Sequence, residues 1–453
     1  MLALCAGRLW GGSCEQLYRP FSCCYYVPVS RLVRGRCCYI SRTSVSPLFV
    51  TLALRPYQEI GRDFLSTRRH ALLADAMRVG KTPQAILAAQ KVGAQEVIVV
   101  CPAIAVPQWY AEWERWWSAS EAPLVVSYDR LRLNQVSLLA NEWDLAIVDE
   151  CHFAKNPETQ RTKLIYGKGG LGHKARRMWV LSGTPATKSA ADLWPMLVAF
   201  GATGMGYSSF CDRYCTFAGW PKRVSGTNPM RVAELRQMLD KIMLRRTLAE
   251  VAPELPPIAF DFLYVEPGNT DIKIPDHITD AHLPAWVDAH AGVDRSDRQA
   301  VAMAKVSRLS ENVAFTINNG LLDKAVVFGW HTSPLETVAA QLQTHGIGVG
   351  LLTGKTSPKQ REWIQTQFKK GSVQVVVANI LAAGTAIDLS AASHGWFLEL
   401  DWLPASNVQA ANRLVAIGGG PVSFDVATWP GSADERIQKV LLTRARELAT
   451  IYS

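Results

Sequence analysis

The feature that most constrains this sequence is a repeated alternation of short apolar runs with longer stretches of helical periodicity. The pattern is typical of parallel α/β sheets, because a parallel strand is joined to the next one through a crossover helix. We predict strands at 96–101, 144–148 and 178–182 in the first half, and at 324–329, 348–352, 373–378 and 396–400 in the second. Two such series predict two α/β lobes, with ligand-binding residues in the loops that follow the strands.

The segment between the two series has a different character. Closely spaced prolines in 253–257 cannot continue a helix or a central strand. Residues 258–320 are polar and partly helical and contain an acid-rich stretch at 276–290. We therefore predict an N-terminal extension (1–50), a first lobe (51–257), a linker with a small helical insertion (258–320) and a second lobe (321–453).

The first fifty residues stand apart from both lobes. They hold six arginines against one acid, Glu15, and six of the ten cysteines. Such a composition fits an organelle transit peptide, a disordered extension, or translation begun upstream of the true start. We favour the last two, because no amphipathic helix of the transit type is visible.

Composition limits the class of protein. A content of 48% hydrophobic and 19% charged residues is typical of soluble globular proteins. No apolar run is long enough to cross a bilayer, which argues against a membrane role. The net charge of +9 suits an anionic partner such as nucleic acid, although much of it lies in residues 1–50.

The cysteines outside the N-terminal extension do not form a disulfide or zinc pattern. Cys101, Cys151, Cys211 and Cys215 are scattered, and they lack the C-x-x-C or histidine partners of a zinc site. We interpret them as structural thiols, which fits a reducing cytoplasm. A bacterial or phage-infected cell is the setting we favour.

The strongest local signal is the segment LLADAMRVGKT at 72–82. Gly80-Lys81-Thr82 is typical of the end of a phosphate-binding loop, where backbone N–H groups and the lysine contact phosphates and the hydroxyl binds Mg²⁺. A helix predicted at 83–91 adds its N-terminal dipole. Asp75 occupies the first glycine position of the strict pattern, so a surface loop that merely contains these letters is the alternative.

A second motif argues against that alternative. DLAIVDECH at 144–152 is an apolar strand that ends in two adjacent carboxylates. Asp149 can hold the Mg²⁺ shell, and Glu150 can polarise the attacking water. The two motifs together predict a site for ATP and Mg²⁺.

With LSGTP at 181–185, these motifs resemble those of superfamily-two helicases, and more narrowly the Swi/Snf-type DNA translocases, including compact annealing-helicase-like members and their phage relatives. Further segments of this chain resemble family motifs in the same order, at 54–58, 99–116, 124–131, 242–257, 351–362, 379–394 and 399–413. The resemblance covers about residues 52–445. It implies two tandem RecA-like P-loop lobes with parallel sheets, which close on ATP and hold DNA, duplex DNA preferred.

The resemblance also implies roles for individual residues. Gln58 would read adenine, and the catalytic residues would be Lys81, Asp149, Glu150 and Arg413, with Mg²⁺ at Thr82 and Asp149. Other nucleotide contacts would come from Asp75, Met77, Arg78, Val79, Gly80, Gly384, Asp388 and Gln409. His152, Ser182 and Thr184 would couple the nucleotide and DNA sites. The second GKT, at 354–356, lacks a preceding P-loop glycine pattern, and we interpret it as a helix start.

Two departures from the family pattern affect the expected chemistry. Arg78 stands where members often have glycine. Gln409 and Arg413 match the first two fixed positions of the family's motif VI, Q-x-x-x-R-x-x-R, but Ala416 stands at its second arginine. An arginine finger contributes on the order of 10³–10⁵ in kcat. We hypothesise that hydrolysis is weakened, or that Arg413 or another nearby cation serves instead.

Four tryptophans, Trp109, Trp113, Trp116 and Trp117, share one helix face. Base stacking is possible at such residues, but core packing is the role we favour.

The function that we predict is an ATP-driven DNA translocase. Remodelling or fork reannealing is favoured over strand separation, because no pin or wedge is evident. The alternatives are an ATP-gated DNA clamp that hardly hydrolyses ATP, and the motor subunit of a larger restriction or remodelling complex.

Overall fold

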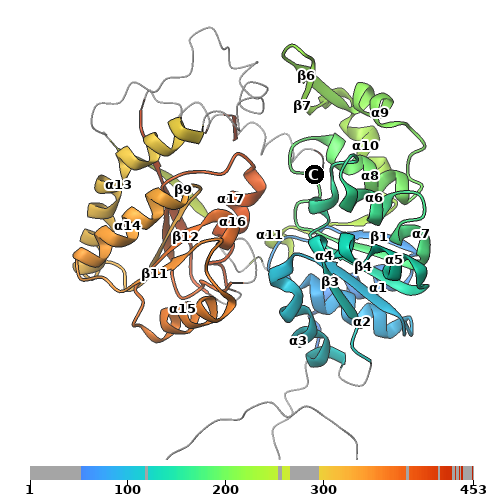
Figure 1. The fold of residues 1–453 in the computed structure, drawn as a ribbon, viewed down its shortest axis with the longest axis horizontal. Coiled ribbons are helices and arrows are strands. Elements are labelled where there is room, and N and C mark those ends of the chain that lie inside the picture. Colours follow the sequence, from blue (N-terminus) through green and yellow to red (C-terminus); the bar gives the residue numbers. More distant parts are fainter. Residues whose placement is uncertain are drawn as a thin grey trace, which may run out of the picture. The chain divides into compact units, whose positions relative to one another are not determined.

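The computed structural model describes residues 53–117, 121–251, 258–265, 295–383, 387–416 and 419–430, with a few further positions. Its core is a pair of six-stranded sheets, each formed by one half of the chain (Figure 1). The N-terminal extension predicted at 1–50 lies outside the described residues.

The first sheet has the strand order β3-β2-β4-β5-β1-β8, and every neighbouring pair is parallel. Its strands are β1 (His70–Leu73), β2 (Val97–Cys101), β3 (Leu124–Ser127), β4 (Trp143–Asp149), β5 (Ala175–Leu181) and β8 (Met243–Leu244). Helices cover both faces because strand side chains alternate. Leu145 and Ile147 of β4 pack into one core, whereas Ala146 and Val148 pack into the other.

The helices of this lobe divide between those two faces. One core receives side chains from α1 (Pro56–Ser66), α2 (Lys81–Lys91) and α3 (Val106–Trp117). The other receives them from α4 (Tyr128–Leu133), α5 (Gln135–Ala140), α6 (Gln160–Tyr166), α7 (Leu171–Lys174), α8 (Trp194–Ala199), α9 (Tyr207–Tyr214) and α10 (Val232–Asp240). The short helix α11 (Leu248–Val251) follows β8.

The second sheet has the order β11-β12-β10-β13-β14-β9 and is likewise parallel throughout. Its strands are β9 (Ala259–Tyr264), β10 (Ala325–Gly329), β11 (Val349–Leu352), β12 (Val375–Asn379), β13 (His394–Phe397) and β14 (Ser423–Thr428). Side chains from α13 (Arg295–Asn318) and α14 (Thr332–Thr344) fill the core on one face. Those from α15 (Pro358–Lys370), α16 (Ile380–Ala383) and α17 (Pro404–Ala411) fill the core on the other. The predicted fold class, two parallel α/β lobes, is confirmed.

Two elements of the range 258–320 differ from the predicted linker and insertion. β9 pairs along its whole length with β14, and α13 buries Val306, Leu309 and Val313 in the second core. The buried Lys305 fixes α13 further, since its ammonium donates to the carbonyls of Leu398 and Ala427 at 2.6 and 2.9 Å. We therefore propose that the second lobe begins near residue 258. The acid-rich stretch at 276–290 lies outside the described residues.

Each of the seven predicted strands overlaps an observed one, but several short strands were not predicted. β1 and β8 span only four and two residues, too few to show a period-two pattern.

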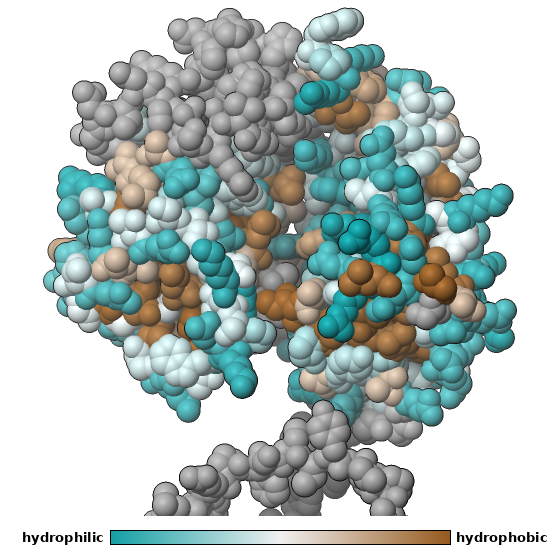
Figure 2. All heavy atoms as spheres, in the orientation of Figure 1, coloured by the Kyte–Doolittle hydropathy of each residue, from teal (hydrophilic) through white to brown (hydrophobic). Residues whose placement is uncertain are grey.

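The structure also contains a hairpin that is not evident from the sequence, formed by β6 (Cys215–Ala218) and β7 (Arg223–Thr227). Its turn carries Trp220, which is 97% exposed. The visible face of the molecule mixes hydrophilic and hydrophobic side chains (Figure 2), as is usual for globular lobes. In the described part of the chain, no helix is long and apolar enough to cross a membrane.

Candidate nucleotide site

The loop between β1 and α2 has the backbone of a phosphate-binding loop. Gly80 precedes the first residue of α2 and has φ +76°, in the left-handed region that favours glycine. A Cβ atom at Gly80 would lie 2.4 Å from Nε2 of Gln58. The backbone conformation therefore favours glycine at this position, and a larger residue would displace the end of the Gln58 side chain.

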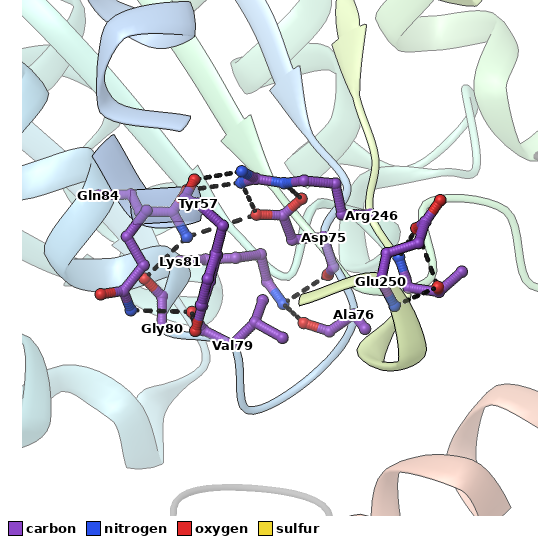
Figure 3. A network of polar contacts seen from close by, with 11 residues as sticks. Tyr57, Asp75, Ala76, Val79, Gly80, Lys81, Gln84, Arg246 and Glu250 are labelled. Atoms are coloured by element: carbon purple, nitrogen blue, oxygen red, sulfur yellow. Dashed lines mark hydrogen bonds and ion pairs between the residues drawn. The ribbon is translucent and has the colours of Figure 1, made fainter. Parts of the chain in front are cut away.

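Lys81 is held against its own loop. Its ammonium donates to the carbonyl oxygens of Asp75 and Ala76 at 2.9 and 3.0 Å (Figure 3). Burial lowers the pKa of Lys81, against the opposing charges of Glu150 and Asp149. These neutral carbonyls are weaker partners for an ammonium than phosphate oxygens are, so the lysine is placed to exchange them for a phosphate.

Asp75, predicted to contact nucleotide, is engaged elsewhere. Its carboxylate is fully buried and pairs with the guanidinium of Arg246, Nε to Oδ1 at 3.0 Å (Figure 3). Arg246 also donates to Oε1 of Gln84 at 3.0 Å and to the carbonyl of Tyr57. Asp75 thus anchors the loop to the segment after β8. Arg246 was not singled out from the sequence, although it lies in the 242–257 segment that resembles the family.

Gln58 lies against the same loop. Its Nε2 donates to the carbonyl of Val79 at 3.0 Å, and its Oε1 accepts from the backbone N–H of Arg55 at 2.9 Å. Val79 itself is buried and faces away from solvent. Gln58 is therefore placed beside the loop, and its role in reading adenine remains a prediction.

The two predicted acids stand at the end of β4. Asp149 accepts three hydrogen bonds: from the indole N–H of Trp109 to Oδ2 at 2.8 Å, from the backbone N–H of Glu150 to Oδ1 at 3.0 Å, and from the Tyr128 hydroxyl to its carbonyl at 2.8 Å. Trp109 is buried in the lobe core as predicted, and its indole also contacts the site. Glu150 has φ +52°, an uncommon value for a side-chain-bearing residue, and such values cluster at functional sites.

Burial acts differently on the two acids. It raises the pKa of Asp149 to about 6, with the neighbouring charge of Glu150 adding to the effect. Burial also disfavours the charged form of Glu150, but contact with His152 and the charges of Lys81 and Arg413 lower its pKa to about 2. Glu150 therefore stays ionised and can accept a proton or orient a water.

The three residues predicted to couple the sites form one hydrogen-bonded chain with Glu150. His152 Nδ1 lies 3.3 Å from Glu150 Oε2 and 3.1 Å from the hydroxyl of Ser182. That hydroxyl donates to Glu150 Oε2 at 3.3 Å and accepts from the N–H of Thr184 at 3.1 Å. A change at Glu150 therefore has a direct structural route to the SGTP segment. That it transmits such a change is a proposal.

Most of the predicted residues meet at one cavity of about 760 Å³. From the first lobe it is lined by Met77, Arg78, Gly80, Lys81, Thr82, Asp149 and Glu150, and from the second by Asp388, Gln409 and Arg413, among others. Gln365, Asn412 and Trp109 also line it and were not predicted as site residues. Gly384 lies outside the described residues. Gln58, Asp75, Val79 and the coupling residues do not line the cavity.

The donor set fits a nucleotide-bound Mg²⁺. Among the described residues, no cluster of three or more His, Cys, Asp or Glu side chains is placed to hold a metal by itself. Mg²⁺ in phosphate sites needs only one or two protein oxygens, because phosphates and waters complete its shell. The Thr82 hydroxyl and the Asp149 carboxylate, which share the cavity wall, supply that number.

Two family matches cover more than half of the chain. Residues 122–280 match the SNF2-related domain, and residues 304–418 match the helicase conserved C-terminal domain. The phosphate-binding loop precedes the first match, so the loop and the matched segments are independent observations.

The curated relatives agree with this assignment. A Xenopus laevis protein named SWI/SNF-related matrix-associated actin-dependent regulator of chromatin subfamily A-like protein 1 is 28% identical over 87% of this chain and 44% of its own length. A mouse DNA annealing helicase and endonuclease is 27% identical over 81% of this chain and 37% of its own length. Both are animal proteins, which lends no support to the predicted bacterial or phage setting.

The chain spans less than half the length of these relatives. A solved structure of the Sulfolobus solfataricus SWI2/SNF2 ATPase core in complex with dsDNA is 22% identical, with a TM-score of 0.42, and covers 89% of this chain and 95% of that chain. From its two matched domains, this chain belongs to the SNF2-related family of helicase-like proteins.

Proposed function

We propose that this chain is a nucleic-acid-stimulated ATPase that hydrolyses ATP between its two lobes to move along or remodel duplex DNA. The observation that carries the proposal is the shared cavity. It brings the Gly80-Lys81-Thr82 loop and the Asp149-Glu150 pair of one lobe together with Gln409 and Arg413 of the other.

Each group has a task in phosphoryl transfer to water. Lys81 and the N-terminus of α2 bind the β- and γ-phosphates. Thr82 and Asp149 would hold Mg²⁺, which would supply positive charge to those phosphates. Glu150 orients the water that attacks the γ-phosphorus, while the bond from that phosphorus to the bridging oxygen breaks and ADP leaves. Arg413 faces the same space from the second lobe and stabilises the negative charge of the transition state.

A nucleotide site lined by two lobes can couple ATP hydrolysis to movement of the lobes. A nucleotide that contacts both lobes favours their approach, and its hydrolysis removes those contacts. DNA held across both lobes through its phosphates would then advance in steps. The relatives named above, one of them a DNA annealing helicase, support DNA as the polymer, and remodelling or reannealing as the outcome.

A second candidate function rests on Ala416. Because the second arginine of motif VI is missing, the chain is also suited to clamp DNA while ATP is bound and to hydrolyse it slowly. Such a clamp would bind DNA tightly with ATP and show little turnover.

Steady-state ATPase activity separates the two functions. We would measure it without nucleic acid and with single-stranded DNA, duplex DNA and RNA, beside a Lys81→Ala control. Strong stimulation by duplex DNA that is lost in the control supports the translocase. ATP binding with negligible turnover on every polymer supports the clamp and overturns the motor.

A further inference from the structure

Position 78 has an unusual backbone for the residue it carries. Arg78 has φ +64°, in the left-handed region that glycine adopts without strain and that arginine rarely does. Only Arg78 and Glu150 share this feature among the non-glycine residues that the structure describes. Strained positions of this kind cluster at functional sites, and the surrounding contacts must hold them in place.

The side chain of Arg78 reaches from the first lobe to the second. Its Nη2 donates to the carbonyl oxygen of Arg413 at 2.6 Å, and its Nη1 lies 3.4 Å from Asp388 Oδ1. Only 22% of the side chain is exposed, and within the described residues its buried Nε has no hydrogen-bond partner. The guanidinium is therefore largely shielded from solvent, and its buried Nε has donor capacity that the described residues do not use.

These contacts join Arg78 to the segment of the second lobe that contains Ala416. The carbonyl that it binds belongs to Arg413, three positions before Ala416 in the same motif. Arg78 lines the cavity together with Lys81, Glu150 and Arg413. The family carries a second positive charge in motif VI of the second lobe. This chain lacks it but carries a positive charge, Arg78, on the phosphate-binding loop.

The partners of Arg78 can be exchanged. Asp388 is also bound by Lys369 at 2.8 Å and by the N–H of Ser390 at 3.2 Å, so it stays neutralised without Arg78. Its pair with Arg78 is long, at 3.4 Å. A γ-phosphate offers oxygens that carry more charge than a backbone carbonyl, and a guanidinium prefers such oxygens as bidentate partners.

We infer that Arg78 supplies, from the phosphate-binding loop, the transition-state charge that Ala416 cannot supply. The inference rests on the proposed function. During hydrolysis Arg78 forms no covalent bond. It donates hydrogen bonds to the oxygens of the phosphoryl group as the water attacks. The negative charge that develops on those oxygens is therefore stabilised by a positioned cation.

The test removes the arginine from position 78 and introduces one at position 416. We would compare Arg78→Gly, which restores the common family residue, Ala416→Arg, and the double variant. Duplex-stimulated kcat and the affinities for ADP and for ADP–aluminium fluoride, which mimics the transition state, would be measured for each. Arg78→Gly should lower kcat by about 100-fold or more and weaken analogue binding by a similar factor, with the ADP affinity little changed. Adding Ala416→Arg should restore at least about one tenth of the lost activity.

Arg78→Gln guards against a folding defect, because it keeps a polar side chain that can donate hydrogen bonds but removes the charge. It should lose analogue binding as Arg78→Gly does, with an unchanged melting temperature. Wild-type kcat in Arg78→Gly, or an equal loss of ADP and analogue affinity in both Arg78 variants, would overturn the inference. If the wild type shows no turnover, the proposed motor fails, and the analogue affinities still decide the role of Arg78.

Discussion

The same three residues, Gly-Lys-Thr, occur twice in this chain, once in each lobe, and the two copies have different structures. In the first copy Gly80 has a left-handed backbone conformation, α2 begins at Lys81, and the half-buried lysine donates to two backbone carbonyls. The charges of Asp149 and Glu150, at the end of β4, act on its pKa. In the second copy Lys355 is exposed and the three residues lie in a turn. Helix α15 begins only at Pro358, where Ser357 caps it. The second copy was predicted to start a helix, and it lies just before one.

The turn of the second copy is closed by its own side chains. The Thr356 hydroxyl accepts from the N–H of Thr353 at 2.9 Å, and Arg361 donates to the carbonyls of Thr353 and Thr356 at 2.9 and 3.2 Å. Arg361 also donates to the carbonyl of Ala382 at 2.8 Å. This turn is a structural connection.

The comparison shows that a short motif acquires chemistry from its surroundings. The first copy has a glycine in the left-handed conformation, a helix that starts at the lysine, and carboxylates at the end of β4 in the same sheet. The Gly-Lys-Thr sequence alone does not specify any of these features. The comparison can be tested by making the same substitutions in both copies.

The largest contrast is expected between the two lysines. Lys81→Ala should reduce duplex-stimulated ATPase activity by about 100-fold or more, because the phosphates lose the cation of the loop. Lys355→Ala should change it by less than about twofold, since an exposed turn lysine contributes little. Equal losses in the two variants, measured at saturating ATP, would mean that the second copy also serves the nucleotide.

The second largest difference is expected between the glycines of the two copies, Gly80 and Gly354. Gly80→Ala introduces a Cβ 2.4 Å from Gln58 Nε2 at φ +76°, which should cost roughly 2 kcal/mol of nucleotide affinity, or about 30-fold. A Cβ at Gly354 meets nothing within 4 Å, so Gly354→Ala should bind nucleotide normally. Titration with a fluorescent ATP analogue measures both. Unchanged binding in Gly80→Ala would refute the loop geometry.

The acids beside the first copy depend on Trp109. Trp109→Phe removes the indole N–H that holds Asp149 Oδ2, so the Mg²⁺ concentration that half-saturates ATPase activity should rise about 10-fold. Trp113→Phe, a buried indole further along α3, is the control for lost packing and should leave the Mg²⁺ dependence as it is. The role assigned to the hydrogen bond is wrong if both variants shift equally.

The smallest effect is expected at the second copy. Arg361→Ala removes the donor to three carbonyls and should lower the free energy of unfolding by about 1 kcal/mol, with nucleotide affinity unchanged. Lys370→Ala, at the exposed end of the same helix, should stay within about 0.5 kcal/mol of the wild type. Urea denaturation would show the difference. A loss of nucleotide affinity in Arg361→Ala would contradict a purely structural turn.

Local patterns were enough to predict much of the fold. The strands predicted at 96–101 and 373–378 contain uninterrupted apolar runs at 97–101 and 375–378, because both faces of these strands are buried. The placement of Lys81, Asp149 and Glu150 followed from a loop and a strand tip of recognisable composition.

The features that sequence reasoning missed are contacts between distant segments. Arg246 and Asp75 are 171 positions apart, and Arg78 meets Asp388 310 positions later. β9 joins its sheet beside β14, which lies far along the chain. Neither periodicity nor spacing carries such pairings, because they are decided by how whole elements pack.

The central claim is that ATP hydrolysis at the first Gly-Lys-Thr drives movement along duplex DNA. The most direct measurement is displacement of a triplex-forming strand from duplex DNA by the wild type, Lys81→Ala and Lys355→Ala. The account predicts ATP-dependent displacement by the wild type and Lys355→Ala, and none by Lys81→Ala. ATP-dependent DNA binding by the wild type without displacement would contradict the motor and leave the clamp.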